Sequence, residues 1–210
     1  MKKNCTEVVF VLDRSGSMCG LEKDTIGGFN SLINKQKKQD GEVLVSTVLF
    51  NDSSVVIHDR KPIDEVRLMT NKDYEVYGCT ALLDALGSSI RHIGNIHKYA
   101  RVEDVPEHTM FVIITDGMEN ASRYYSKERV KLMIEYEKEK YGWEFLFLAA
   151  NMDAIDTARQ YGIDKDHAVN YQCDSVGTRL NYEVLDEAIQ CICSGVPLSK
   201  SWKSKIEKCK

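Results

Sequence analysis

Four near-continuous apolar runs alternate with amphipathic stretches along this chain, at residues 7–12, 43–50, 110–115 and 144–149. Each run is rich in valine, isoleucine, leucine and phenylalanine. Such runs are typical of strands whose two faces are both covered, as in a mostly parallel sheet. We therefore predict four buried strands at the centre of a sheet.

Two shorter segments complete the predicted sheet. Residues 55–58 follow a polar turn at 51–54, so we expect them to return as an antiparallel strand at one edge. Residues 167–171 are predicted to form a sixth strand at the opposite edge.

Helical patterns separate the predicted strands. The first covers residues 21–37, with Ile26, Phe29 and Ile33 inward and a lysine-rich end that suits the helix dipole. Apolar positions at helical spacing predict further helices around residues 82–93, 130–141 and 184–192. Alternating strands and helices of these lengths predict an α/β three-layer sandwich. Its sheet would be Rossmann-like, doubly wound and mostly parallel, with about six strands, one antiparallel edge strand and helices on both faces.

Two features of the predicted helices need no special chemistry. The Gly27-Gly28 pair costs about 1 kcal/mol per glycine relative to alanine, and we attribute it to close packing of the first helix on the sheet. His92 and His97 lie five residues apart without a Glu-x-x-His pattern, so we interpret them as structural or surface residues.

The chain has 210 residues, enough for one domain with a sizeable core and short for two. We expect a single domain over residues 1–195 and a lysine-rich tail over residues 196–210. The tail carries Trp202 and Ile206 one helical turn apart, which leaves three interpretations open. It is a solvated tail, a short helix that docks on a partner, or a segment that packs Trp202 on the body.

Composition argues against several classes of partner and location. A formal net charge of −4 gives no reason to expect binding to nucleic acid or to anionic membranes. No stretch approaches the roughly 18 apolar residues of a membrane span, and the apolar run near the N-terminus is short for a secretory signal. The seven cysteines are irregularly spaced, without a CxxC pair, which favours reduced thiols. We therefore expect a cytoplasmic protein.

Polar oxygen-bearing residues follow two of the predicted strands and precede one helix. Asp13, Ser15 and Ser17 come directly after the first run, Thr80 precedes the helix around residue 82, and Asp116 follows the run 110–115. In an open parallel sheet, the carboxyl ends of the strands form the ligand-binding edge. Carboxylate and hydroxyl oxygens suit Mg²⁺ or Mn²⁺ better than zinc or copper. We therefore expect a divalent-cation site at the strand ends.

Each piece of this pattern also has an ordinary interpretation. Ser15-Gly16-Ser17 fits a turn that caps a helix, with Asp13 as a carboxylate at the helix start. Thr80 fits the N-cap of the following helix, and Asp116 before a glycine fits a plain turn. It is the occurrence of all three pieces, in order and after strands, that favours a metal site.

The arrangement Asp13-x-Ser15-x-Ser17, then Thr80, then Asp116 resembles the five-point metal-ion-dependent adhesion site of von Willebrand factor A (vWA) domains. The resemblance covers the fold pattern of residues 4–195 and is greatest to compact, stand-alone bacterial vWA proteins with phrases like Asp-Gly-Met-Glu-Asn-Ala-Ser, which is found here at 116–122. All five ligand positions match the family pattern.

The resemblance implies a role for each of these residues. Ser15 and Ser17 would bind Mg²⁺ or Mn²⁺ directly. Thr80 would bind it directly when a partner is engaged and through water otherwise, and Asp13 and Asp116 would act mostly through water. The metal would then accept an Asp or Glu carboxylate from another protein, which makes it a non-enzymatic docking point. The family analogy alone suggests a bacterial stress or chaperone-type complex, such as a tellurium-resistance system.

Five neighbouring residues are weaker candidates. Glu119 and Asn120 either hydrogen-bond to the ligands or belong to a solvated loop. Asp84 either orients a metal-bound water or is an ordinary first-turn helix carboxylate. Tyr77 and Cys79 are expected at the rim of the site.

The main alternative function is a magnesium-dependent phosphohydrolase or phosphotransferase that uses the same strand-end site. Such an enzyme would need a second carboxylate two residues after Asp13 and a lysine for the phosphate. Ser15 occupies that position instead. Neither the GxxxxGK[ST] nor the GxGxxG signature of nucleotide binding occurs in the sequence.

Overall fold

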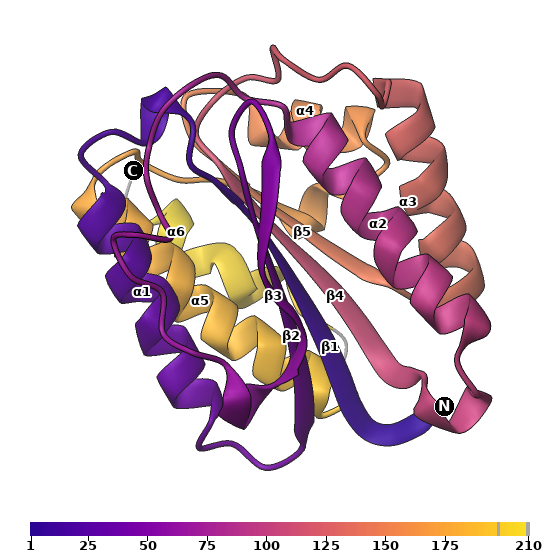
Figure 1. Ribbon diagram of the computed structural model, residues 1–210. Coiled ribbons are helices and arrows are strands. Elements are labelled where there is room, and N and C mark those ends of the chain that lie inside the picture. The colour runs from indigo at the N-terminus through magenta and orange to yellow at the C-terminus, as the bar shows by residue number, and fades with distance from the viewer. Residues whose placement is uncertain (197, 209–210) are drawn as a thin grey trace.

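A six-stranded sheet forms the centre of the protein in the computed structural model, which describes residues 1–196 and 198–208 (Figure 1). The strand order is β3-β2-β1-β4-β5-β6, and every neighbouring pair is parallel except β2 and β3. The strands are β1 (Lys2–Asp13), β2 (Glu42–Phe50), β3 (Ser54–Pro62), β4 (Pro106–Thr115), β5 (Glu144–Ala149) and β6 (Ala168–Asn170).

Helices cover both faces of this sheet. Figure 1 shows α1 and α5 on one side and α2 and α3 on the other. Buried residues of α6 join the apolar core under α1 and α5, and those of α4 join the core under α2 and α3. The helices are α1 (Glu22–Gln36), α2 (Leu82–Tyr99), α3 (Lys127–Tyr141), α4 (Ala154–Gln160), α5 (Ser175–Cys193) and α6 (Ser204–Glu207).

Side-chain alternation along β1 divides the interior into these two cores. Val8 and Phe10 point into the core under α1 and α5, whereas Val9 and Val11 point into the core under α2 and α3. All four side chains are buried, because the strand lies in the middle of the sheet with a helical layer on each face.

The predicted fold class is confirmed: the sheet is mostly parallel, β3 is an antiparallel edge strand, and helices lie on both faces. Several boundaries differ from the prediction. β1 begins at Lys2 rather than at residue 7, because polar residues also pair with β4 there. α5 begins at Ser175, well before the apolar stripe at 184–192. The short helix α4 was not predicted, since its 7 residues are too few for a clear helical period.

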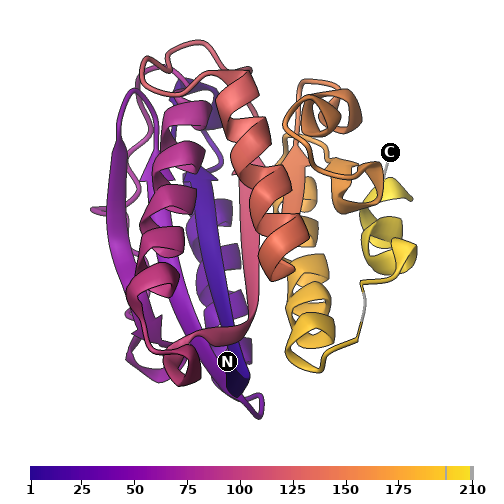
Figure 2. The ribbon, with the colours of Figure 1, turned by 90° about the vertical axis from the view of Figure 1, so that its right-hand side faces the viewer.

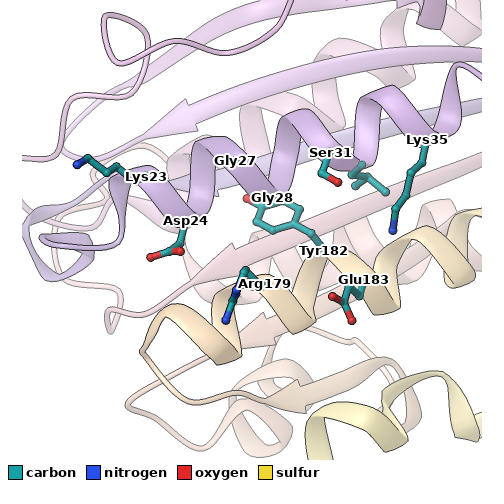
Figure 3. Close-up of a pocket in the computed structure, with 10 residues that line it drawn as sticks. Lys23, Asp24, Gly27, Gly28, Ser31, Lys35, Arg179, Tyr182 and Glu183 are labelled. Atoms are coloured by element: carbon teal, nitrogen blue, oxygen red, sulfur yellow. The ribbon is translucent and has the colours of Figure 1, made fainter.

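Of the Gly27-Gly28 pair, only Gly28 lies at a close contact, and that contact is between two helices rather than between α1 and the sheet. A Cβ atom on Gly28 would lie 2.2 Å from Cδ2 of Tyr182, a residue of α5. A Cβ on Gly27 would meet nothing within 4 Å. Figure 3 shows the Tyr182 ring between the two helices, beside a groove of about 200 Å³. The attribution to packing on the sheet is therefore corrected: Gly28 allows the close approach of α1 and α5.

The C-terminal segment packs on the body of the protein over the part that the structure describes. Trp202 and Ile206 are buried in the core under α1 and α5. The indole Nε1 of Trp202 donates a hydrogen bond to the backbone oxygen of Asp166 at 2.9 Å. Of the three interpretations of this segment, packing of Trp202 is the one observed. The domain boundary at residue 195 stays a prediction, and residues 197, 209 and 210 lie outside the described residues.

Within residues 1–196 and 198–208, no helix combines the length and the apolar character that crossing a membrane requires.

Candidate metal centre

The candidate site lies where two central strands end. β1 ends at Asp13, and its parallel neighbour β4 ends at Thr115, so Asp13 and Asp116 reach the same edge of the sheet. Both aspartates are buried. In the strand order, β1 and β4 also mark the point where the chain changes its direction of growth across the sheet. Open α/β sheets bind ligands at this position.

Three hydroxyl groups converge beside these aspartates. The Oγ atoms of Ser15 and Ser17 lie 3.1 Å apart, and Thr80 Oγ1 donates to Ser15 Oγ at 3.1 Å. Ser17 Oγ donates to Asp116 Oδ1. The Asp13 carboxylate adjoins this cluster. Its Oδ1 accepts the Ser15 N–H at 2.7 Å, and its Oδ2 accepts from Thr115 Oγ1 at 2.6 Å. The structure thus brings all five sequence-predicted ligands together.

Local chemistry explains how the segment after β1 holds its hydroxyls in place. The hydrogen bond from the Ser15 N–H to Asp13 is the side-chain-to-backbone contact that stabilises an aspartate turn. The buried side chain of Met18 anchors the short helical turn that follows. The Gly16 N–H donates to the backbone oxygen of Gly78 at 3.0 Å, which attaches this turn to the loop that carries Thr80.

Thr80 is not the N-cap of α2. Ala81 occupies that position and makes no side-chain capping bond. The first turn of the helix is capped instead by Glu119, whose Oε2 accepts the Leu83 N–H at 2.8 Å. The Thr80 hydroxyl therefore faces Ser15 rather than its own helix. Ser15 likewise makes no side-chain capping bond to the short helical turn.

Gly117 keeps the space between the hydroxyls open. A Cβ atom at this position would lie 2.7 Å from Thr80 Oγ1, 3.1 Å from Ser17 Oγ and 3.6 Å from Ser15 Oγ. The surrounding donors are hydroxyl and carboxylate oxygens, the set that Mg²⁺ and Mn²⁺ prefer. In the part of the chain described, no three or more histidine, cysteine, aspartate or glutamate side chains are grouped to hold a metal. A cation here would therefore need the hydroxyl oxygens, and the residues present fit one.

Two buried tyrosines donate hydrogen bonds to the backbone at the ends of β1 and β4, and Thr115 donates to Asp13 as described above. Tyr74 OH donates to the backbone oxygen of Asp13, and Tyr171 OH donates to the backbone oxygen of Thr115 at 3.4 Å. Burial raises the pKa of both phenols well above the usual value, so they remain donors. Sequence reasoning missed the two tyrosines, because neither adjoins a motif, and it gave Thr115 no role of its own although Thr115 precedes Asp116.

Solved structures with a similar fold come from several organisms. They include a von Willebrand factor type A protein from Catenulispora acidiphila, with 12% identity and a TM-score of 0.56 over 88% of this chain. The ArnB paralog VWA2 from Sulfolobus acidocaldarius has 17% identity and a TM-score of 0.56 over 88% of this chain. The vWF domain of the type V pili tip protein Mfa5 from Porphyromonas gingivalis has 10% identity and a TM-score of 0.64 over 92%. This chain has the von Willebrand factor A fold.

The vWA fold is what these comparisons show. The chain spans 42% of the Catenulispora acidiphila protein, 45% of the Sulfolobus acidocaldarius protein and 97% of the Mfa5 domain. No protein-family model matches the sequence, and no curated protein matches it.

Two buried carboxylates lie near each other at these strand ends. Burial raises the pKa of Asp13, and the negative charge of Asp116 adds to this effect. Hydrogen bonds from Thr115 and Ser15 oppose the rise by stabilising the carboxylate. A divalent cation would offset the cost of keeping two buried carboxylates ionised at one edge of the sheet.

The raised pKa of Asp13 leads to a pH-dependent prediction for metal-free protein. In the unfolded chain the Asp13 carboxyl ionises near pH 3.9. In the folded protein it stays protonated to higher pH, because burial raises its pKa. The contribution of Asp13 to stability is therefore present below the unfolded pKa and is lost as pH rises through the folded pKa. The Asp13→Asn variant cannot ionise and should therefore gain stability relative to wild type as pH rises above about 4.

Urea unfolding of both proteins in chelator, at several pH values on each side of that point, would measure this difference. Acids that both proteins share cancel in the comparison, including Asp73, whose pKa Arg67 holds below its usual range. A stability difference that does not change with pH would contradict the prediction.

The weaker candidates occupy distinct positions around the candidate site. Asn120 Oδ1 accepts the Thr80 N–H at 2.9 Å and so positions a predicted ligand. Glu119 caps α2 as described, and both of its oxygens also accept from the 121–122 segment. The oxygens of Asp84 accept the N–H groups of residues 123–125 at 2.7–2.8 Å. Its carboxylate therefore holds a loop rather than facing the hydroxyl cluster.

The rim contains both predicted residues and one cysteine that the sequence did not indicate. Tyr77 and Cys79 are exposed, and the Arg14 guanidinium lies 5.5 Å from the centre of the Tyr77 ring. The Sγ atom of Cys173 donates to Asp116 Oδ2 at 3.3 Å. Burial raises the pKa of Cys173 to about 11, which keeps it a thiol at neutral pH. Cys173 follows β6, so only the sheet topology brings it to the site.

Proposed function

We propose that this protein is a non-enzymatic interaction module whose partner binds through a divalent cation. Asp13, Ser15, Ser17, Thr80 and Asp116 would hold Mg²⁺ or Mn²⁺, and the cation would accept an aspartate or glutamate carboxylate of another protein. One observation carries the proposal: three hydroxyls and Asp116 surround a space at the strand ends that the missing side chain of Gly117 leaves open.

The chain's own residues account for how such a site would work. Ser15 and Thr80 are buried and fixed by hydrogen bonds, whereas Ser17 is exposed and opens the cluster to solvent. The nearest donors are uncharged hydroxyls. A bound cation would therefore keep attraction for an incoming carboxylate, which is the chemistry it would supply.

The enzymatic alternative has less support. A phosphohydrolase of this architecture would place a second carboxylate where Ser15 stands, and the Ser15 hydroxyl is instead hydrogen-bonded to Ser17 and Thr80. The vWA fold itself suggests a protein-interaction module.

Calorimetric titration of Mn²⁺ and Mg²⁺ into chelator-stripped protein tests the proposal. We expect saturable binding by wild type, and affinity at least about tenfold weaker in Asp13→Ala and Asp116→Ala. Asp84→Ala is the matched control, because it removes a carboxylate of the same kind that faces the 123–125 backbone instead. Equal behaviour of wild type and both site variants at millimolar Mn²⁺ would refute the metal site.

A further inference from the structure

The edge of the sheet next to the candidate site is open along half of one strand. β3 pairs only with β2, and Figure 2 shows no described element outside it. Near the site, Val55 and Val56 are 44% and 53% exposed. The far half carries Asp59, a left-handed Arg60 with φ of 47°, and Pro62. Such residues protect an edge from pairing, so only the half near the site can accept another strand.

A groove runs between this half of β3 and α2. One part, of about 330 Å³, has an apolar floor made by Val48, Val56 and Ile93. A hydrogen bond between His92 Nε2 and Asp59 Oδ1, at 2.9 Å, lies beside it. A second part, of about 520 Å³, shares Ser54, Ser88 and Arg91 with the first, so the two parts adjoin.

The second part of the groove reaches the loops of the candidate metal centre. It is lined by Asp52, whose Oδ1 accepts the Cys79 N–H at 2.9 Å. The Ala81 N–H donates to the backbone oxygen of Asn51 at 2.8 Å. The turn that begins β3 is therefore hydrogen-bonded to the residues on both sides of Thr80, so the groove and the candidate metal centre share these loops.

The charges available in the groove favour an acidic occupant. Arg91 and Arg129 line its second part, both are exposed, and neither forms an ion pair with any residue the structure describes. The guanidinium of Arg129 lies 5.8 Å from the centre of the Tyr125 ring, which leaves its edge free. Of the acids that line the groove, Asp84 accepts three backbone N–H groups, Asp52 accepts the Cys79 N–H and Asp59 contacts His92, so none of them pairs with either arginine. Two guanidinium groups thus remain to meet an anion.

We propose that an extended, acidic segment of a partner protein pairs with the edge of β3 at residues 54–58. Its backbone would add a strand to the sheet, one apolar side chain would enter the groove beside Val56, and its acidic side chains would meet Arg91 and Arg129. A further acidic residue would reach the metal, and this last contact rests on the proposed function. The partner class is therefore a peptide that combines alternating apolar residues with several carboxylates.

Selection from a random peptide library displayed on phage, in buffer with Mn²⁺, tests this. We expect the selected peptides to share acidic residues and an alternating apolar pattern. Synthetic copies should bind at least about tenfold more weakly to Val56→Lys and to Arg91→Glu, and N-methylation of alternate peptide bonds should have a similar effect. Both substitutions are at exposed positions, and thermal unfolding would verify that the variants fold.

Val55→Lys is the matched control. Val55 neighbours Val56 but pairs with Leu49 in the other core, so its side chain faces away from the groove. Its effect on the peptide Kd should stay within about twofold. Selection of no peptide, or equal binding by wild type, Val56→Lys and Arg91→Glu, would overturn the proposal. So would a dimer in sedimentation that Val56→Lys dissociates, because a second copy would then occupy the edge.

Chelator separates this inference from the proposed function. If peptides bind equally with and without Mn²⁺ but remain sensitive to Val56→Lys, the groove stands and the metal contact fails. If Mn²⁺ binds in calorimetry and no peptide depends on Val56, the metal site stands and the groove fails.

Discussion

Replacing Gly117 with alanine is expected to weaken divalent-cation binding at least about tenfold while leaving the fold intact. The added methyl group would lie 2.7 Å from Thr80 Oγ1 and 3.1 Å from Ser17 Oγ, inside the space that a cation would need. Gly117 is not among the glycines with positive φ, so alanine meets no backbone strain there. The substitution therefore changes the site by filling it, without removing any oxygen donor.

Calorimetry with Mn²⁺ would measure this effect. We expect the affinity of Gly117→Ala to fall by at least about tenfold, as in Asp116→Ala. Gly27→Ala is the control, because a Cβ at that position meets nothing within 4 Å and the residue lies on α1. Binding of Mn²⁺ by Gly117→Ala with wild-type affinity would show that the hydroxyl cluster is not the binding site.

Replacing Glu7 with alanine is expected to cause a large loss of stability. The Glu7 side chain is fully buried, and its two oxygens contact Arg60 Nε and His97 Nε2, each at 2.7 Å. Removing Glu7 leaves Arg60 without its counter-charge and His97 without its hydrogen-bond partner at a largely buried position. We expect the free energy of unfolding to fall by about 3 kcal/mol or more.

Urea unfolding of Glu7→Ala beside Glu42→Ala would test the role of burial. Glu42 pairs with Lys2 on the surface, where both side chains are more than two-fifths exposed. Exposed pairs contribute about 1 kcal/mol or less, so Glu42→Ala should change stability little. Losses of similar size in the two variants would contradict the prediction.

The central strands and their edge partner were predictable because their signal is local. A strand covered on both faces must be apolar at nearly every position, and β2, β4 and β5 carry that pattern over nearly their whole length. The polar turn before β3 likewise indicated a hairpin, which the antiparallel pairing of β2 and β3 confirms. The start of β1 and the helix α4 were missed, since pairing and packing rather than local pattern produce them.

The candidate ligands were predictable for a related reason. Asp13, Ser15 and Ser17 are neighbours in the sequence, and a strand followed by a turn places them at the ligand-binding edge of a parallel sheet. Asp116 follows a second strand in the same way. Whether these oxygens hold a cation stays a prediction for the titrations to decide.

The pattern of residues along the chain was therefore enough to predict the fold class, the edge of the sheet that carries the polar oxygens and the types of residue there. The surroundings of those residues follow from how distant segments pack. This packing brought Tyr74, Tyr171 and Cys173 to the strand ends, turned Asp84 toward a loop and buried Glu7 between Arg60 and His97. Local patterns record which faces are covered, because burial of apolar area constrains every residue of an element. Polar contacts between distant segments leave no periodic trace, because a single residue on each side is enough to make them.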